Sequence, residues 1–314
     1  MKDRANTLDA LRARPVVVFL NSAAGGGRAG AYLPRIRSVF AAQEIEAQFV
    51  ATNSATDLET SARYAISQDQ RVLFAMGGDG TFQALANAAF GSDVLLGIIP
   101  LGGGNDFAAA LGVPSDPVKG TEAVLRGSPR FVDMVRVRTA EGRTRLYAGG
   151  GGVGLDAEAA RHSSGVYRHF PGRCRYIAAA LRALAGYKPL GIRVDFPGND
   201  FPSLEAKALL AAVLNSPTYG GGLRLAPGAA VDDKSLHVVL IEDLSWIEVL
   251  ALLPRLIASG ELRTSRVKRW RTRRLRLTTD RPSVFHGDGE ILGSTPVEIE
   301  LAEKAVQVLA PVSR

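Results

Sequence analysis

One short segment combines an apolar run with three glycines placed around a single carboxylate. Residues 72–76 have the composition of a buried strand, Gly77-Gly78-Asp79-Gly80 follow, and residues 81–89 suit a helix. Glycines at a strand-to-helix turn allow backbone N–H groups to approach phosphate oxygens, because no Cβ intervenes. A carboxylate there can hold a phosphate-bound Mg²⁺ or accept a proton from an attacking hydroxyl. A tight turn capped by Asp79 is the alternative, and the motif alone does not decide between the two.

The first 135 residues alternate between strand and helix patterns. Strands are expected at 14–21, 44–52, 71–76 and 95–100, and helices at 31–42, 56–67, 81–89 and 105–111. Such alternation predicts a parallel sheet covered by helices on both faces. Ligands of these sheets bind beyond the carboxyl ends of the strands. The loops that begin at Asn21, Gly77 and Pro100 are therefore expected to converge on one cleft.

After residue 135 the pattern changes to one dominated by strands. Apolar or alternating runs occur at 135–139, 146–150, 192–196, 208–215, 235–241, 275–279 and 297–301, and helices are expected at 153–162, 176–187 and 246–258. This predicts a second, mainly antiparallel domain of β-sandwich type. We place the first domain at 1–135 and the second at 136–301, with residues 302–314 returning to the first.

Composition narrows the class of protein. At 314 residues the chain exceeds the usual size of one core. The single cysteine, Cys174, excludes an internal disulfide and a cysteine-based zinc site. No signal-peptide pattern and no apolar run of ~20 residues occurs, so we expect a cytoplasmic protein. The net charge of +7 favours an anionic partner such as a nucleotide, a nucleic acid or a membrane.

Three further loops place polar residues or glycines where chemistry is expected. Asn21 opens a glycine-rich stretch to Arg28 that suits phosphate binding, although it is neither a Walker loop nor a strict dinucleotide turn. In the loop 100–108, Asn105 and Asp106 stand at a helix start, where they could cap the helix or bind a substrate hydroxyl. The stretch 286–290, His-Gly-Asp-Gly-Glu, by itself indicates a turn.

Together these motifs resemble the diacylglycerol kinase catalytic domain family, bacterial soluble lipid kinases related to sphingosine kinases. The matching stretches run through nearly the whole chain: Asn21–Gly27, Gly77–Thr81, Gly102–Ala108, Asp133, Gly152–Asp156, Leu225–Asp233 and Asp288–Glu290. NAD kinases and phosphofructokinases share the Gly-Gly-Asp-Gly turn, whereas the Asn-Asp-Phe-Ala loop and the late Asp-Gly-Glu are specific to the lipid kinases. The resemblance implies a Rossmann-like nucleotide domain of the NAD kinase and diacylglycerol kinase type, a β-sandwich lipid domain, and a cleft between them.

The resemblance also implies roles for individual residues. Glu290 would be the general base toward the lipid hydroxyl, Asp79 would organise Mg²⁺ and phosphate, and Asp133 would join the nearby charge network. In the sphingosine-kinase branch the turn carboxylate is treated as the base, so this division stays open. Asn105 and Asp106 would bind substrate. The residues implied to bind ATP are Asn21, Ser22, Gly25, Gly26, Thr52, Gly77, Gly78, Asp79, Gly80, Thr81, Phe82, Gln83 and Gly103.

A structural Mg²⁺ in the sandwich is implied as well. Its ligands would be the Asp233 carboxylate and the carbonyls of Ala230 and Ser235, since a hard cation prefers oxygen. Two positions depart from the family pattern. Gly103 stands where threonine is usual, so one nucleotide contact is missing or rerouted through the backbone. Lys234 stands where glycine is expected, and its cation could compete with Mg²⁺.

The stretch Arg263–Arg276 is rich in arginine and lysine and contains no acid. The solvated face of two β-strands is the alternative, and residues 274–277 alternate like a strand. We expect docking on an anionic membrane, with Trp270 at the interface. Nucleic acid is not expected, because no recognition helix, aromatic platform or zinc module accompanies the charges. The protein would then be peripherally membrane-associated, and the sequence leaves a homodimer open.

The sequence therefore predicts ATP- and Mg²⁺-dependent phosphorylation of a lipid hydroxyl, with diacylglycerol as the leading acceptor and phosphatidic acid as the product. A sphingoid base, ceramide or another lipid alcohol would need the same chemistry. An NAD kinase would keep Asp79 but would have no use for the basic stretch. A catalytically idle lipid-binding protein is disfavoured, because every expected carboxylate is present.

Overall fold

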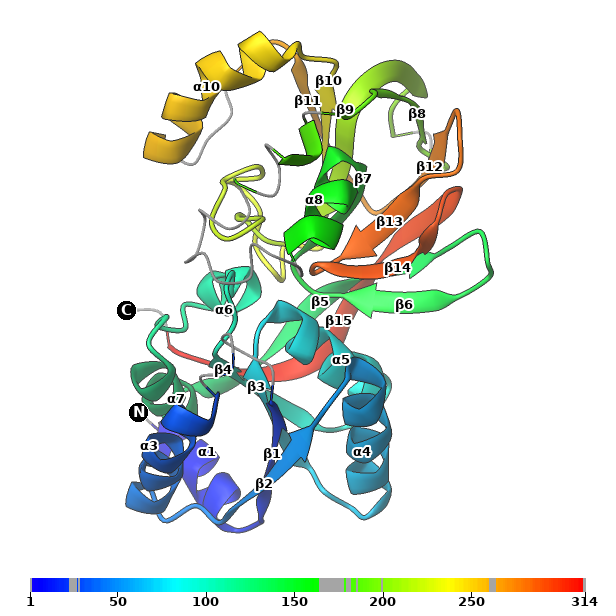
Figure 1. Cartoon of the computed structure of the whole chain (residues 1–314). Helices are drawn as coiled ribbons and strands as arrows, with labels where there is room; N and C mark the ends of the chain where they lie inside the picture. The colour runs from blue at the N-terminus through cyan, green and yellow to red at the C-terminus, as the bar shows by residue number, and fades with distance from the viewer. Residues whose placement is uncertain are drawn as a thin grey trace. The chain divides into compact units, whose positions relative to one another are not determined.

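A parallel sheet and an antiparallel sandwich make up the two units into which the chain divides (Figure 1). The computed structural model describes residues 2–22, 27, 29–163, 178, 182–184, 186–198, 200–259 and 264–312. Unit 1 comprises Met1–Val132 with Lys304–Arg314, and unit 2 comprises Asp133–Glu303. The chain passes from one unit to the other within two strands, β5 (Ser128–Arg138) and β15 (Val297–Ala310).

Four parallel strands form the centre of unit 1. These are β1 (Val16–Asn21), β2 (Ala47–Thr52), β3 (Val72–Gly77) and β4 (Leu95–Pro100), in the order β2-β1-β3-β4. The C-terminal part of β15 pairs with β4, also in parallel. Asn21 is in register with Thr52, and Gly77 with Pro100. All four strands therefore end at the same edge of the sheet.

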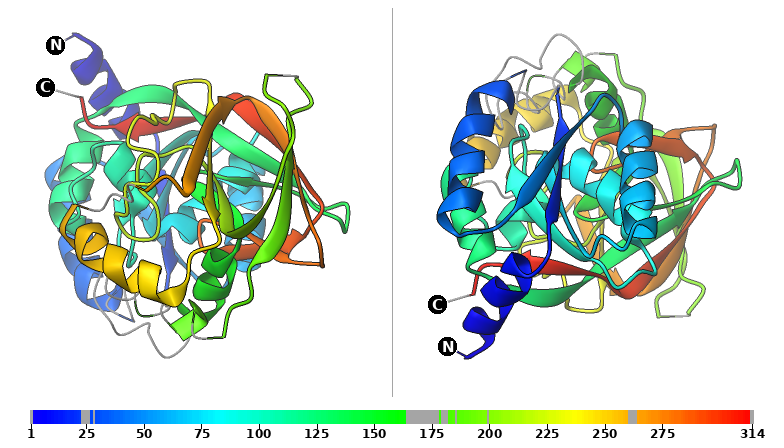
Figure 2. Two further views of the ribbon diagram at one scale, coloured as in Figure 1. Left: turned by 90° about the horizontal axis from the view of Figure 1, so that it is seen from above. Right: turned by 90° about the horizontal axis from the view of Figure 1, so that it is seen from below.

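Helices cover both faces of this sheet (Figure 2, right). α3 (Ala29–Ala42) packs with α7 (Pro117–Leu125) on one face, and α4 (Ala55–Ser67) packs with α5 (Asp79–Ala89) on the other. Every residue of β3 is buried, as two covered faces require. Two further helices belong to the unit, α1 (Lys2–Arg12) and the short α6 (Asp106–Ala110).

Antiparallel strands make up unit 2 and enclose its interior. The remaining strands are β6 (Thr144–Tyr147), β7 (Gly150–Gly154), β8 (Leu190–Asp195), β9 (Leu204–Leu214), β10 (Leu236–Glu242), β11 (Val267–Thr272), β12 (Arg274–Thr279), β13 (Val284–Gly287) and β14 (Glu290–Ser294). They pair in the order β14-β13-β7-β9-β8-β12-β15, with β10 between β9 and β11, and β6 beside β5. Two helices belong to this unit, α8 (Leu155–Ser163) and α10 (Trp246–Ser259).

Strand β10 shows how unit 2 builds two apolar clusters. Val238 and Leu240 point into the sandwich interior, where they meet residues such as Leu275 of β12. Val239 and Ile241 point the opposite way, into a second cluster that α10 covers. Successive side chains of a strand alternate between faces, so one buried strand serves both clusters.

The predicted fold class is confirmed, with several local differences. α1, α7, β13 and β14 were not expected from the sequence, and the alternative of two strands within 263–276 corresponds to β11 and β12. The single strand expected at 146–150 is two strands, β6 and β7, because the amides of residues 148–150 bond to a side chain instead of continuing one ladder. Most of the helix expected at 176–187, and Cys174, lie outside the described residues.

Candidate functional site

The loops at the carboxyl edge of the parallel sheet contact one another. The Asn21 side-chain amide donates to the Thr81 hydroxyl at 3.3 Å, which joins the first loop to the second. The Ser22 backbone N–H donates to the carbonyl of Thr52 at 3.3 Å. The Thr52 hydroxyl donates to the Leu20 carbonyl at 3.2 Å, so this side chain is committed to the strand end. The convergence expected from strand order is present in unit 1.

Two glycines allow the second and third loops to meet. A Cβ built on Gly102 would lie 2.5 Å from the Cα of Gly78, and one built on Gly78 would lie 3.0 Å from the Cα of Gly102. No side chain fits at either position without moving the backbone. The glycines therefore bring two strand-to-helix turns into direct backbone contact.

The Asp79 carboxylate spans these two loops. Its oxygens accept the backbone N–H groups of Asp106, at 3.2 Å, and of Phe107, at 3.1 Å. Asp79 thus caps the N-terminus of α6 from another part of the chain. Asn105, with φ of 57°, adopts the left-handed conformation, and its side-chain oxygen accepts the N–H of Gly102 at 2.8 Å. The carboxylate and the Asn-Asp pair form one hydrogen-bonded assembly.

The N-terminus of α5 fits a phosphate group. Its N-cap is Gly78, which offers no side-chain acceptor to the first-turn amides. A helix start without a side-chain cap, among glycines, is a typical anion site. Two of the residues expected to bind ATP, Phe82 and Gln83, have buried side chains. The Phe82 ring stacks on Phe107, with ring centroids 4.7 Å apart. Gly25 and Gly26 lie outside the described residues, whereas Gly103 is exposed in the third loop.

In unit 2 the predicted base stands directly after a hairpin turn. β13 and β14 are joined by Asp288 and Gly289, whose φ angles of 52° and 85° are both positive. A two-residue hairpin with this geometry is a type I′ turn, for which Asp-Gly is a preferred pair. Glu290 opens β14 and is exposed. Among the residues that the structure describes, its carboxylate has no hydrogen-bond partner.

The Asp288 carboxylate fixes this turn in place. It accepts the backbone N–H groups of Ala148 at 2.7 Å, Gly149 at 2.9 Å and Gly150 at 3.2 Å. Burial raises the pKa of Asp288 to about 6, although these three hydrogen bonds act in the opposite direction. Asp288 was not among the expected site residues, although it stands in the Asp-Gly-Glu motif. Its role follows from a contact about 140 residues away in sequence, which the motif alone does not show.

A buried polar cluster adjoins the hairpin. The Tyr219 hydroxyl lies 2.6 Å from Nε2 of His286 and donates to the Asp156 carboxylate at 2.9 Å. Burial raises the pKa of Tyr219 well above its usual value, with the negative charge of Asp156 as the next cause. The cluster joins β13, α8 and the loop after β9 behind the turn that carries Glu290.

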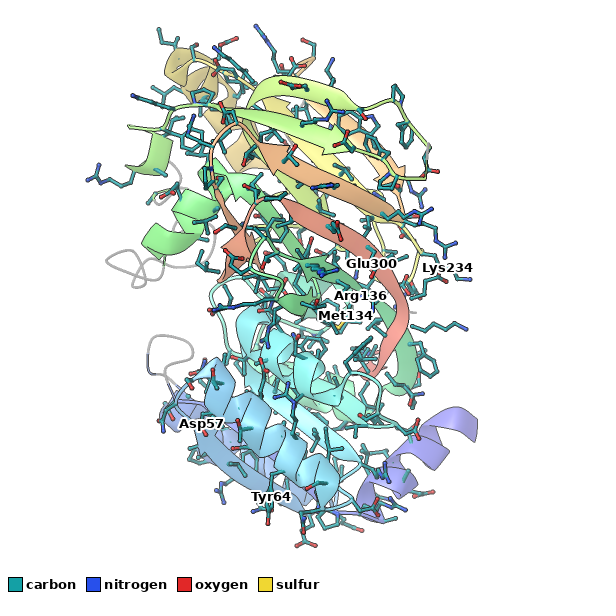
Figure 3. The ribbon with its side chains drawn as sticks, turned by 90° about the vertical axis from the view of Figure 1, so that its right-hand side faces the viewer. Asp57, Tyr64, Met134, Arg136, Lys234 and Glu300 are labelled. Atoms are coloured by element: carbon teal, nitrogen blue, oxygen red, sulfur yellow. The ribbon has the colours of Figure 1, made fainter. Side chains whose placement is uncertain are left out.

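Asp133 is buried and holds the loop before β10. Its carboxylate accepts the backbone N–H of Lys234 at 2.9 Å, and its own N–H donates to the carbonyl of Val231 at 2.7 Å. Lys234 has φ of 58°, in the left-handed region, and its side chain is exposed (Figure 3). Glycine reaches that conformation without strain, which explains the glycine expected at this position.

The expected ligands of a structural metal are arranged differently from a cation site. The Asp233 carboxylate accepts the N–H groups of Ala230, at 3.2 Å, and Ser235, at 3.0 Å, so these residues direct amides toward it. Nε2 of His237 lies 2.8 Å from the same carboxylate, and the Arg271 guanidinium lies 3.5 Å away. This donor set does not fit a bound Mg²⁺ as it stands. The structural magnesium ion remains a prediction.

Both parts of the chain match known sequence families. Residues 15–137 match the diacylglycerol kinase catalytic domain, and residues 151–310 match the YegS C-terminal NAD kinase beta sandwich-like domain. A diacylglycerol kinase of Mycobacterium tuberculosis is 28% identical over 248 residues, which cover 79% of each chain. A Xanthomonas oryzae protein named "Probable lipid kinase YegS-like" is 30% identical over 242 residues, covering 74% of this chain and 77% of that one.

A solved structure shares the fold. The crystal structure of a diacylglycerol kinase from Bacillus anthracis matches 94% of this chain and 96% of its own, with a TM-score of 0.71 and 19% sequence identity. At that identity the likeness concerns the fold alone. In the described part of the chain, no helix has both the length and the apolar character needed to cross a bilayer.

Proposed function

This chain belongs to the diacylglycerol kinase catalytic domain family and is an ATP-dependent lipid kinase, and we propose that its acceptor is the free hydroxyl of diacylglycerol. The relatives named diacylglycerol kinase support this acceptor, and one structural observation supports transfer to a hydroxyl. The Glu290 carboxylate is exposed without a partner among the described residues, on a turn that Asp288 clamps. A carboxylate held in this way can accept a proton from a hydroxyl that is presented to it.

The loops of unit 1 would bind the nucleotide. The first turn of α5 and the glycines around Asp79 would contact the phosphates, and Asp79 would face the metal-bound phosphate with an orientation fixed by its bonds to α6. Mg²⁺ bound with ATP would neutralise the negative charge that develops on the transferred phosphoryl group. Asn105 and Asp106 would help to place the acceptor.

The transfer itself needs one proton acceptor. The acceptor oxygen forms a bond to the γ-phosphorus, the bond from that phosphorus to the bridging oxygen breaks, and ADP leaves. The hydroxyl proton passes to the carboxylate of Glu290. Asp288 would act on position, because its carboxylate holds three backbone N–H groups behind the turn, and Asp133 would fix the loop before β10 through Lys234.

Radiolabelled ATP offered with separate acceptors tests the substrate. The panel contains diacylglycerol, sphingosine, ceramide, phosphatidylglycerol and NAD, each dispersed in detergent. We expect phosphate transfer to diacylglycerol with kcat/KM at least tenfold above any other acceptor, and loss of that transfer in Glu290→Gln. Faster transfer to sphingosine or ceramide would reassign the acceptor within the lipid alcohols, and transfer to NAD alone would overturn the proposal.

A further inference from the structure

Helix α10 presents apolar side chains to solvent. Ile247 is 63% exposed and Leu250 is 43% exposed, and Pro254, one further turn along, is exposed as well. These positions share one face of the helix. On the opposite face, Val249 and Leu252 pack against the second apolar cluster of unit 2. The helix is thus apolar on both its buried and its exposed sides.

The length of α10 limits how it can meet a membrane. Its 14 residues span about 21 Å at 1.5 Å per residue, which is less than the ~30 Å hydrocarbon core of a bilayer. A helix that is too short to span and carries an apolar exposed face can lie in the plane of the interface. Its only charged residues are Glu248 and Arg255, so little opposes burial of the stripe.

A basic groove lies on the same face of unit 2. It encloses about 890 Å³, and its walls include Arg224, Arg269, Arg271 and His237 but no acidic residue. Arg269 is in register with Val239 of β10, which belongs to the cluster beneath α10. Directly opposed residues of an antiparallel pair share a face, so Arg269 lies on the side that α10 covers. Figures 1 and 2 show α10 and the loop between β9 and β10 on this side of the strands.

Hydrogen bonds to the protein hold two of these arginines at the groove. Arg269 donates through Nε to the Leu225 carbonyl at 3.3 Å, and Arg271 donates to the Ser235 hydroxyl at 3.2 Å. Asp233 is the acid beside the groove, 3.5 Å from Arg271, and it also contacts His237.

Cations of the basic stretch outside the groove also face acids. Lys268 lies 3.6 Å from Glu242, and Arg273 forms an ion pair with Glu303. Arg276 on β12 is in register with both Glu298 and Asp195 on the neighbouring strands. The groove, by contrast, sets three arginines against one nearby acid, Asp233, so its balance of charge is positive.

We propose that the exposed face of α10 and this groove form one docking surface for an anionic phospholipid bilayer. α10 lies in the interface with Ile247 and Leu250 among the acyl chains, and headgroup phosphates bind Arg224, Arg269 and Arg271. The proposal rests on the proposed function in one respect, since a lipid acceptor requires the enzyme to reach a bilayer. A second copy of the chain is the weaker candidate, because a two-fold contact would set one cationic groove against another.

Vesicle co-sedimentation of the full chain without ATP tests the surface. One variant removes the apolar stripe, Ile247→Asn with Leu250→Asn, and another removes two groove charges, Arg224→Gln with Arg269→Gln. The matched control, Arg274→Gln with Arg276→Gln, removes equal charge from β12, where the two arginines flank the interior residue Leu275. Thermal unfolding verifies that each variant is folded.

One cation near an anionic surface contributes about fivefold to binding. We therefore expect the groove pair to weaken binding to phosphatidylglycerol vesicles about 25-fold at 0.1 M salt, and the control pair by no more than about threefold. The apolar pair should abolish the binding that survives at 0.5 M salt, where charges are screened. Neutral phosphatidylcholine vesicles should bind every variant weakly.

Two outcomes would overturn the proposal. Equal losses from the groove and control pairs would mean that net charge, not this groove, attracts the bilayer. A dimer that becomes a monomer in the apolar pair, with vesicle binding unchanged, would make α10 an interface between copies. A failure of the proposed function would look different from a failure of this docking surface. The protein would still bind vesicles, but it would phosphorylate none of the lipids dispersed in detergent.

Discussion

The Asp79 carboxylate accepts the backbone N–H of Phe107 at 3.1 Å, across 28 residues of sequence. The same carboxylate also accepts the N–H of Asp106, so a single side chain in the glycine-rich turn anchors the next loop. Asp79 therefore has a structural role in unit 1 in addition to the phosphate-facing role that we propose. The two roles can be separated, because each affects a different measurement.

Asp79→Asn is expected to lower turnover at least 100-fold, because the charge that faces the metal-bound phosphate is lost. It should also lower the free energy of unfolding by about 1–2 kcal/mol, because asparagine offers one neutral acceptor where the carboxylate offers two charged ones. Asp116→Ala is the matched control, since Asp116 caps α7 through Val118 and Lys119 and losing an N-cap side chain costs about 1 kcal/mol. It should lose similar stability in urea unfolding while retaining turnover. Full turnover of Asp79→Asn would contradict the proposed role.

Glu290→Gln should lower kcat by about 10²–10⁴-fold and leave the KM for ATP unchanged, because a general base acts on the acceptor and not on the nucleotide. Stability should stay within about 0.5 kcal/mol, since the side chain is exposed. Glu298→Gln, an exposed change on β15, serves as the control. If Glu290→Gln remains active while Asp79→Asn is inactive, the proton acceptor is Asp79.

The raised pKa of Asp288 predicts how stability varies with pH. The folded state holds the proton with a pKa of about 6, whereas the ordinary value is 3.8. The resulting stabilisation is complete below pH 3.8 and is lost as pH rises through 6. From pH 7 to pH 5 the wild type should therefore gain about 1 kcal/mol relative to Asp288→Asn. Urea unfolding of both proteins at the two pH values measures this gain, and parallel behaviour would show that the carboxyl titrates normally.

Lys234→Gly is expected to stabilise unit 2 by about 1 kcal/mol. The φ of 58° at this position is strained for lysine and free for glycine, and the N–H to Asp133 is retained. Lys234→Ala removes the same charge without relieving the backbone, so it should not stabilise the protein. If both substitutions raise the free energy of unfolding equally, the loss of the lysine charge, and not the backbone conformation, is the cause.

The parts of the fold that depend on local pattern could be read from the sequence. β1 to β4 lie within a few residues of their expected positions, because each is a short apolar run followed by a turn. α7 was missed although Asp116-Pro117 is a typical helix start, with a capping aspartate before proline at the first position. The β13–β14 hairpin was also missed, although Asp288-Gly289 is a favoured turn pair.

Long-range pairing accounts for what the sequence could not show. The basic stretch contains no acid, yet Arg276 faces Asp195 and Glu298 once β12 joins β8 and β15. Trp270, expected at the bilayer interface, packs against Phe196 with ring centroids 5.8 Å apart. A linear pattern cannot show which strand will neutralise a charge or cover a ring.

The discontinuous make-up of unit 1 sets an order of events during translation. β4 pairs with β3 on one side, and its other side is paired only when Gln307 and Val308 of β15 join Leu95 and Leu96. The ribosome therefore has to synthesise all of unit 2, Asp133–Glu303, while the edge of β4 is still unpaired. A nascent chain that stops before residue 304 carries an open sheet edge, the kind of surface that chaperones shield and that promotes aggregation. Unit 1 is thus the first to be synthesised and the last to be completed.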